Sequence, residues 1–214
     1  MGVRQIGARV HRVEDDNLIR GEGKYLDDIQ LPNMGYAAFL RSSMAHAKIS
    51  ITDTEAARTL DGVQAVFTYD TLPSSLVSKT QLETYPAPII KQSMCPELLA
   101  NDEVAHVGQA IAMVIANTRH VAEDACELIQ VEYTPLTPVV DVIKAAKSDS
   151  QLTHSSLKDN IAASIETKFG DVETAFEECE DSIELSFKQN RLGCHSMECR
   201  GVLGDWQQQL GELT

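Results

Sequence analysis

Two cysteines and a histidine lie close together near the C-terminal end of the sequence, at Cys194, His195 and Cys199. Thiolates and imidazole are ligands that zinc prefers, but a structural zinc site has four ligands and only three are near. A free cysteine more commonly serves as a small buried apolar residue. We therefore expect no metal ion at this cluster.

Two further histidines, His46 and His106, have the chemistry of a general base, because imidazole titrates near neutral pH. Neither has a serine, cysteine or carboxylate at a spacing typical of a catalytic pair. Histidines without such a partner are usually exposed or hydrogen-bonded within a core. The sequence thus favours a structural role for both.

Paired acids at Asp27-Asp28 and at Glu14-Asp15-Asp16 carry the charge needed to hold a cation. No calcium-binding loop pattern surrounds them, so turn capping or solvation is the expected role. The segment Gly21-Glu22-Gly23 lacks the third glycine and the preceding strand that a phosphate-binding loop needs. None of these groups predicts a reactive site.

The overall charge excludes one class of partner. Lys and Arg total 18 against 32 Asp and Glu, which gives a net charge of -14 and a pI near 4.7. Such a surface repels phosphate backbones, so we expect no nucleic-acid partner. The N-terminal residues are polar, and the longest apolar run, 110–116, is too short to span a bilayer. These features predict a cytoplasmic protein without a membrane partner.

The elements that would position these residues follow an α/β pattern. Strands are predicted at 36–40, around Ile49 and Ile51, and at 63–68, with a short helix from Asp53-Thr54 to Leu60 that Gly62 ends. The run 110–116 is continuously apolar, as expected of a strand covered on both faces.

A helix should follow that strand, because Thr118 is a good N-cap and an apolar stripe continues to Ile129. Another strand begins at Val131 and ends before Pro135. Residues from about 20 to 135 are therefore predicted to form one compact α/β unit. The new helix should pack on the strand through the residues Val121, Ala125, Cys126 and Leu128.

Residues 144–158 are polar and are predicted to bridge two regions. Beyond them, Gly170-Asp171 should open a helix whose apolar residues recur at helical spacing from Val172 to Cys179. Alternation at 183–187 predicts a half-buried strand, and a further strand is expected near 202–206.

The sequence resembles the N-terminal part of the large subunit of the xanthine dehydrogenase, aldehyde oxidase and carbon monoxide dehydrogenase family. Three stretches carry the likeness, in the family's order and spacing over nearly the whole chain. They include Arg12-Val13-Glu14-Asp15, Tyr25, Asp27-Asp28-Ile29, Leu31-Pro32, Arg41-Ser42 and Ala45-His46-Ala47; then Glu103 to Gln109, the apolar strand, Ala122-Glu123-Asp124-Ala125 and Val131-Glu132-Tyr133; and finally Gln189-Asn190-Arg191-Leu192 and Met197-Glu198-Cys199-Arg200-Gly201.

The resemblance implies an α/β hammerhead domain, which is a mixed sheet with helices, followed by the start of a molybdenum cofactor-binding domain. We expect an N-terminal extension at 1–20, the hammerhead domain at 21–143, a linker at 144–158 and the first part of the cofactor domain at 159–214. One departure is Cys199, where the family usually has proline.

In the family, a Ser-Thr-Gln motif beside molybdenum, a glycine-rich loop and the base-acting glutamate all lie further along the chain, and the sequence stops at Thr214. We therefore expect no catalytic, cofactor-binding or metal-binding residue here, and no such role for His195, Glu198 or Arg200. The isolated chain is expected to bind no cofactor and to be inactive. The parent enzyme would carry molybdopterin, with FAD and 2Fe-2S clusters on partner subunits or domains.

Three hypotheses about the protein remain open. It is a truncated portion of a molybdenum hydroxylase, a natural short subunit completed by a separate cofactor-binding chain, or a free-standing binding module with the hammerhead fold. Enzymatic activity belongs only to an intact hydroxylase. Partners are expected to be the remainder of the large subunit and the FAD and iron–sulfur subunits. Residues 159–214 should either self-associate or be less ordered, because they hold elements that need neighbours.

Overall fold

A computed structural model describes residues 7, 11–77, 91–92, 97–190, 192–193 and 195–214. The chain divides into two compact units. Residues 33–179 form one unit, and residues 1–32 together with 180–214 form the other. The first unit contains both three-stranded sheets and the buried core.

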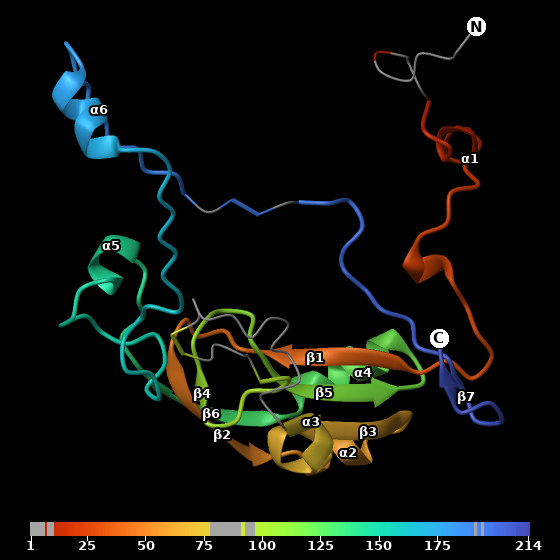
Figure 1. The fold of residues 1–214 in the computed structure, drawn as a ribbon. Helices are drawn as coiled ribbons and strands as arrows, with labels where there is room; N and C mark the ends of the chain where they lie inside the picture. Colours follow the sequence, from red (N-terminus) through yellow and green to blue (C-terminus); the bar gives the residue numbers. More distant parts are fainter. Residues whose placement is uncertain (1–6, 8–10, 78–90, 93–96, 191, 194) are drawn as a thin grey trace, which may run out of the picture. The chain divides into compact units, whose positions relative to one another are not determined.

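One sheet has β5 (Ala110–Ala116) at its centre, between β1 (Tyr36–Arg41) and β3 (Val63–Thr68) (Figure 1). Both neighbours run antiparallel to β5. The predicted interior strand is confirmed, because Ile111 and Val114 are each 0% exposed. The two side chains belong to different apolar clusters, which explains why the strand is apolar on both faces.

The second sheet has β2 (Ala47–Asp53) at its centre, between β4 (Glu103–Val104) and β6 (Gln130–Pro135). Both pairings are antiparallel. Ile49 of β2 shares an apolar cluster with Ile111 of the first sheet. The two sheets are thus joined through their buried faces, in the mixed α/β architecture that the sequence predicts.

Helix α4 (Arg119–Glu127) packs on β1 and β5. It begins as predicted, with the Thr118 side chain accepting a hydrogen bond of 3.2 Å from the Val121 amide. The prediction is wrong for Leu128, which is 39% exposed. Since each residue advances an α-helix by about 100°, Leu128 falls at the edge of the buried stripe. That stripe consists of Ala122, Ala125, Cys126 and Ile129.

The short helix α2 (Glu55–Thr59) precedes β3, also as predicted. Its first turn is capped by Asp53, whose carboxylate accepts a 2.8 Å hydrogen bond from the Glu55 amide. Gly62 then turns the chain with a φ of 89°. A Cβ atom there would lie 2.6 Å from the side-chain oxygen of Asn117. Only glycine fits this turn.

The remaining elements are short. The first unit also contains η2 (Tyr69–Thr71), α3 (Ser74–Val77), α5 (Val142–Ala145) and α6 (Val172–Glu178), and the second unit contains α1 (Asp15–Ile19), η1 (Leu26–Asp28), β7 (Trp206–Gln207) and β8 (Glu212–Leu213). Within the described residues, no helix is both long enough and apolar enough to cross a bilayer.

Helix α6 forms where the sequence predicts it, with Asp171 capping the amide of Thr174. Its apolar side chains are largely exposed, since Val172 is 57% and Phe176 is 66% exposed. The half-buried strand predicted at 183–187 is wrong, because those residues have no strand structure and Ile183 and Phe187 are 85% and 89% exposed. Alternation of apolar and polar residues indicates that one face of a segment could be buried, but a stable strand also needs a hydrogen-bonded neighbouring strand.

The strand expected near 202–206 begins later, at β7, which pairs with β8 in an antiparallel hairpin. Gly211 makes the turn with a φ of 66°. Both strands are exposed. The two strands of the hairpin therefore pair with each other but bury none of their side chains.

Candidate functional site

The candidate residues of the first 110 positions do not form a reactive centre. His106 is exposed. The acidic groups serve local turns: Asp28 accepts a 2.9 Å hydrogen bond from the Tyr25 amide, and Asp15 and Asp16 pair with arginines on the same turn. No group of three or more His, Cys, Asp or Glu that could hold a metal occurs in the part of the chain that the structure describes.

The cysteine and histidine cluster near the C-terminal end is exposed at His195 and Cys199, while Cys194 lies outside the described residues. Cys126, in contrast, is buried in the core, and burial raises the pKa of its thiol. A thiol with a raised pKa is a poor nucleophile at neutral pH. Cys126 therefore acts as an apolar core residue.

His46 is the candidate that the structure places in an unusual setting. It directly precedes β2 and is 4% exposed. The register of β2 and β4 pairs Lys48 with Glu103 and Ala47 with Val104, so His46 stands diagonally across from Glu103 on the same sheet face. Diagonal neighbours in an antiparallel pair lie within reach of long side chains. The contact between them follows directly from the register.

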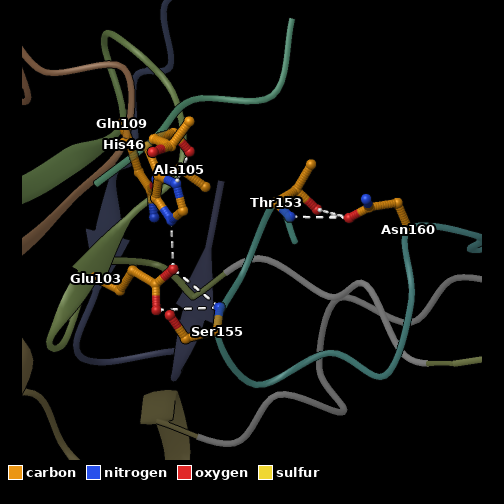
Figure 2. A network of polar contacts seen from close by, with 8 residues as sticks. His46, Glu103, Ala105, Gln109, Thr153, Ser155 and Asn160 are labelled. Atoms are coloured by element: carbon orange, nitrogen blue, oxygen red, sulfur yellow. Dashed lines mark hydrogen bonds and ion pairs between the residues drawn. The ribbon is translucent and has the colours of Figure 1, made fainter. Parts of the chain in front are cut away.

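Both ring nitrogens of His46 contact hydrogen-bond acceptors. Nδ1 lies 2.8 Å from the carbonyl oxygen of Thr137. Nε2 lies 2.7 Å from Oε1 of Glu103 (Figure 2). A carbonyl and a carboxylate only accept, so an imidazolium, which carries an N–H on each nitrogen, would satisfy both contacts. Burial would lower the pKa of His46, but the hydrogen bonds to Glu103 and Thr137 and the Glu103 charge raise it overall.

Glu103 completes the contact with a third segment. Its two carboxylate oxygens accept from the Ser155 amide at 3.0 and 3.2 Å. Burial would raise the pKa of Glu103, but the hydrogen bonds from His46 and Ser155 and the His46 charge lower it overall. We call His46, Glu103, Thr137 and Ser155 the His46 network. It connects β2, β4, the end of β6 and the segment at 155.

Asn160 organises the segment that carries Ser155. Its amide nitrogen donates to the Ala145 and Gln151 carbonyls at 3.1 and 2.8 Å and to the Ser150 hydroxyl at 3.0 Å. Its amide oxygen accepts from the amide and the hydroxyl of Thr153 at 2.8 and 3.1 Å. One side chain thus holds residues 145–153 in a fixed loop, although the sequence predicts only a polar bridge there.

Gln92 holds the same segment from another side. Its side-chain nitrogen lies 2.8 and 3.1 Å from the carbonyl oxygens of Asp159 and Ile161, and the Lys91 amide donates to the Ala162 carbonyl at 2.9 Å. Residues 145–162 are therefore fixed at several points to the unit that contains both sheets.

The first two stretches that carry the family likeness meet near this network. The Ser42 amide donates to the Gln109 carbonyl at 2.8 Å, and the Gly108 amide donates back to the Ser42 carbonyl at 2.8 Å. The Arg41 guanidinium adds a 2.9 Å bond to the Gly108 carbonyl. The Gln109 side chain also accepts from the Ala105 amide at 2.8 Å (Figure 2). These motif residues support one another structurally.

The hydrogen bonds of the His46 network hold separate segments together and occupy both His46 ring nitrogens. A general base needs a free nitrogen lone pair within reach of a substrate. Both His46 nitrogens are occupied, and the His46 side chain is 3% exposed. The sequence points to His46 as a candidate and includes Glu103 in a family motif, but it gives no signal that pairs the two residues. The strand register that joins them is set by tertiary structure.

The third stretch that carries the family likeness consists of residues 189–192 and 197–201, and its described residues are exposed. Met197 is 101% exposed and Leu192 is 85% exposed. Glu198 accepts a 2.8 Å hydrogen bond from the Leu26 amide within the same compact unit. A cofactor the size of a pterin requires an enclosed pocket with converging polar groups. The exposed residues 195–201 do not provide that enclosure, so they do not by themselves fit the group.

The fold and these motifs agree with the comparison to known families. Residues 20–137 match the sequence model of the aldehyde oxidase and xanthine dehydrogenase a/b hammerhead domain, and residues 153–214 match that of the molybdopterin cofactor-binding domain. A hammerhead domain followed by a cofactor-binding region defines the class of the protein. The chain belongs to the aldehyde oxidase and xanthine dehydrogenase family, as part of a molybdenum hydroxylase large subunit.

Individual relatives support the same assignment. The chain is 35% identical to the nicotine 6-hydroxylase large subunit of Paenarthrobacter nicotinovorans over 94% of its own length and 24% of that protein. It is 38% identical to the carbon monoxide dehydrogenase large chain of Afipia carboxidovorans, over 73% and 18%. The solved quinoline 2-oxidoreductase of Pseudomonas putida 86 superposes with a TM-score of 0.60 at 35% identity, over 73% and 20%.

The chain spans about a quarter of the length of the nicotine 6-hydroxylase subunit and less of the other two proteins. What those proteins oxidise is a property of their whole chains.

Proposed function

We propose that this chain is the structural N-terminal portion of a molybdenum-dependent hydroxylase and that it is inactive in isolation. The observation that carries the proposal is the contrast between its two parts. The sheets bury two apolar clusters, whereas apolar side chains beyond residue 170 are exposed, including Phe176, Ile183 and Phe187. A surface of that kind is typical of a segment that packs against more protein.

The proposed role is to pack against the cofactor-binding domain and help to shape its cavity. Attack of a metal-activated oxygen on an electron-poor carbon requires a dry and rigid pocket. The His46 network and Asn160 supply rigidity where the hammerhead region leads into the cofactor-binding region. No residue of this chain takes part in the chemical step under this proposal.

Elemental analysis and dye-coupled oxidation assays on the purified 214-residue chain test the proposal. We expect no stoichiometric molybdenum and no oxidation of aldehydes, purines or N-heterocycles. Stoichiometric molybdenum with turnover would overturn it. The test applies to the chain as purified from a host that makes the molybdenum cofactor.

We also propose partners: the remainder of a large subunit, and proteins or domains that carry FAD and iron–sulfur clusters. The names of two relatives support assembly, since one is a large subunit and another is the gamma subunit of a dehydrogenase complex. Co-expression of the tagged chain with a polypeptide covering the unmatched part of a relative's large subunit, followed by co-purification, tests the first partner. Failure to co-purify with a folded partner would count against it.

The exposed apolar side chains also help to choose among a truncated portion of a hydroxylase, a short natural subunit and a free-standing binding module. They favour completion by further polypeptide, in the same chain or a separate one, over a free-standing binding module. Sequencing the coding region beyond Thr214 distinguishes the first two cases. An unbroken frame that encodes Ser-Thr-Gln favours one chain, and an adjacent gene that begins there favours a separate subunit.

For the domain limits we propose a hammerhead domain at 21–143, a linker at 144–158 and cofactor-domain residues from 159. The two family matches support this division, because they leave residues 138–152 between them. Limited proteolysis with mass spectrometry would test it through the ends of the stable fragments.

A further inference from the structure

The outer face of the second sheet is exposed along β2 and buried at His46, where β2 begins. Along β2, Lys48 and Ser50 are exposed on this face, as expected of a sheet with one solvated side. His46 lies on the same face but is 4% exposed. The residues that contact this end of the sheet are Thr137 and Ser155, which hydrogen-bond to the His46 ring and to Glu103. The contacts made by Thr137 and Ser155 therefore accompany the burial of His46.

We propose that the His46 network is a protonation-dependent latch, in which an imidazolium at His46 and a carboxylate at Glu103 hold the Ser155 segment on the outer face of the hammerhead sheet. Ser155 lies within the region matched by the cofactor-binding model, and His46 and Glu103 lie within the hammerhead match. The latch thus fixes the start of the region matched by the cofactor-binding model against the region matched by the hammerhead model. His46 is a positioning residue, because it acts on Ser155 through Glu103.

The count of donors and acceptors explains why the latch depends on a proton. Thr137 and Glu103 offer acceptors to the two ring nitrogens at 2.8 and 2.7 Å. A neutral imidazole has one N–H, so after deprotonation one nitrogen would turn a lone pair toward an oxygen. In a buried site this leaves an unpaired acceptor and an uncompensated carboxylate. The Ser155 amide would then bond to a carboxylate that has lost its counter-charge.

The charges that influence the protonation of His46 and Glu103 are mainly those of these two residues themselves. Among the described residues, Glu103 is the charged group that raises the pKa of His46, and His46 is the one that lowers the pKa of Glu103. Other titratable groups near the network in the sequence or the strand register include Lys48 opposite Glu103, Asp102 and His106 on either side of β4, Asp141 after Thr137, and His154 beside Ser155.

Asn160 and Gln92 make the latch effective, because they keep the segment folded independently of His46. Their hydrogen bonds fix residues 145–153 and 159–161. Opening of the latch would therefore release a short stretch around Ser155 and leave the flanking loop in place. Because the change is limited to the stretch around Ser155, it can be distinguished experimentally from unfolding of the whole domain.

Nuclear magnetic resonance of the ¹⁵N-labelled chain, titrated from pH 5 to pH 10, tests the proposal. We expect the His46 ring resonances and the Ser155 amide resonance to titrate with one shared midpoint above the ordinary histidine value of about 6.5. Amide exchange of Ser155, corrected for the intrinsic pH dependence, should speed up about tenfold or more across that midpoint. The amides of β5 should not change.

Two variants sharpen the test. Glu103→Gln should lower the His46 midpoint and remove the coupled change at Ser155, whereas His120→Gln, at an exposed position of α4, should change neither. A Ser155 amide that stays equally protected while His46 titrates would overturn the proposal, as would a His46 midpoint at or below the ordinary value in the wild-type chain. The wild-type titration decides the matter even if Glu103→Gln fails to fold. Neither readout depends on hydroxylase assembly.

Discussion

Nε2 of His46 lies 2.7 Å from Oε1 of Glu103, although 57 positions separate the two residues in the sequence. The side chains are 3% and 12% exposed, so the pair is largely removed from water. Each partner has a second anchor, the Thr137 carbonyl for His46 and the Ser155 amide for Glu103. A buried pair with additional hydrogen bonds is costly to break, because the remaining partner keeps its charge without compensation.

Replacement of His46 by glutamine is therefore expected to lower the free energy of unfolding by about 3 kcal/mol. The urea midpoint should fall while the slope of the transition stays the same. His106→Gln is the matched control, since His106 is exposed, and should change stability by less than about 0.5 kcal/mol. Equal stabilities for the two variants would contradict a tightly held pair.

The same pair predicts how stability depends on pH. The pKa of His46 is raised in the fold, so its contribution is complete below the unfolded value of about 6.5 and is lost as pH rises through the folded pKa. The pKa of Glu103 is lowered, so its contribution is complete above the unfolded value of about 4.3 and is lost as pH falls through the folded pKa. Both contributions are complete between about pH 4.3 and 6.5.

Urea unfolding at pH 5.5 and pH 9 measures this dependence. The wild-type chain should lose more stability between the two pH values than the double variant His46→Gln with Glu103→Gln, which lacks both titrating groups. Identical losses in the two proteins would mean that other groups control the pH dependence.

Substitution in the core gives a prediction that is independent of charge. Ile111 is 0% exposed and lies on the central strand β5, so Ile111→Ala should lower the free energy of unfolding by about 3 kcal/mol through lost burial and a residual cavity. Ile165→Ala removes the same atoms from a side chain that is 73% exposed, and should change stability by less than about 0.5 kcal/mol. Calorimetry or urea titration of both variants tests the difference.

Asn160 offers a test of local order. Asn160→Ala removes five hydrogen bonds within the loop and should raise the rate of tryptic cleavage after Lys144 and Lys147 about tenfold or more. Asn101→Ala, at an exposed turn, is the control and should leave the rate unchanged. A cleavage rate unaffected by Asn160→Ala would mean that the loop is held by other contacts.

The strands and helices of the hammerhead unit could be predicted because burial is periodic there. The run 110–116 is apolar throughout, and it became the central strand. Thr118 and Gly62 mark helix ends through local chemistry that needs no tertiary information. Leu128 shows the limit of this reasoning. Its spacing from Val121 suits a helix face, but the sheet contacts a face centred one residue further along.

The candidate site was less predictable, because it depends on register and on a segment that has no periodic pattern. Nothing in the sequence near His46 indicates that Glu103 will lie diagonally across from it. The polar residues 144–158 give no amphipathic signal, yet Asn160 bonds at five points to three carbonyl or hydroxyl groups and to Thr153. Side-chain amide networks of this kind depend on three-dimensional proximity, and residue type alone does not specify it.

The last prediction concerns the residues from 172 onward. Helix α6 presents Phe176 at 66% exposure, and the segment 183–187 presents Ile183 and Phe187 at 85% and 89%. Large apolar side chains that are exposed to this extent tend to associate with other protein when it is available. The backbone at 183–187 also has no strand partner in the described part of the chain, so its amides lack the protection that β5 has.

We therefore expect amides at 183–187 to exchange with solvent at least about a hundredfold faster than those at 111–116 in dilute solution. At higher concentration, light scattering should reveal self-association, and the double variant Phe176→Ser with Phe187→Ser should reduce it. Val107→Ser is a control, because Val107 is 63% exposed in a turn next to the sheet and should not affect association. A monomer at all concentrations, with equal protection at 183–187 and 111–116, would contradict this prediction. In that case residues 159–214 would already form a complete folded unit, and the proposal that they await further polypeptide should be abandoned.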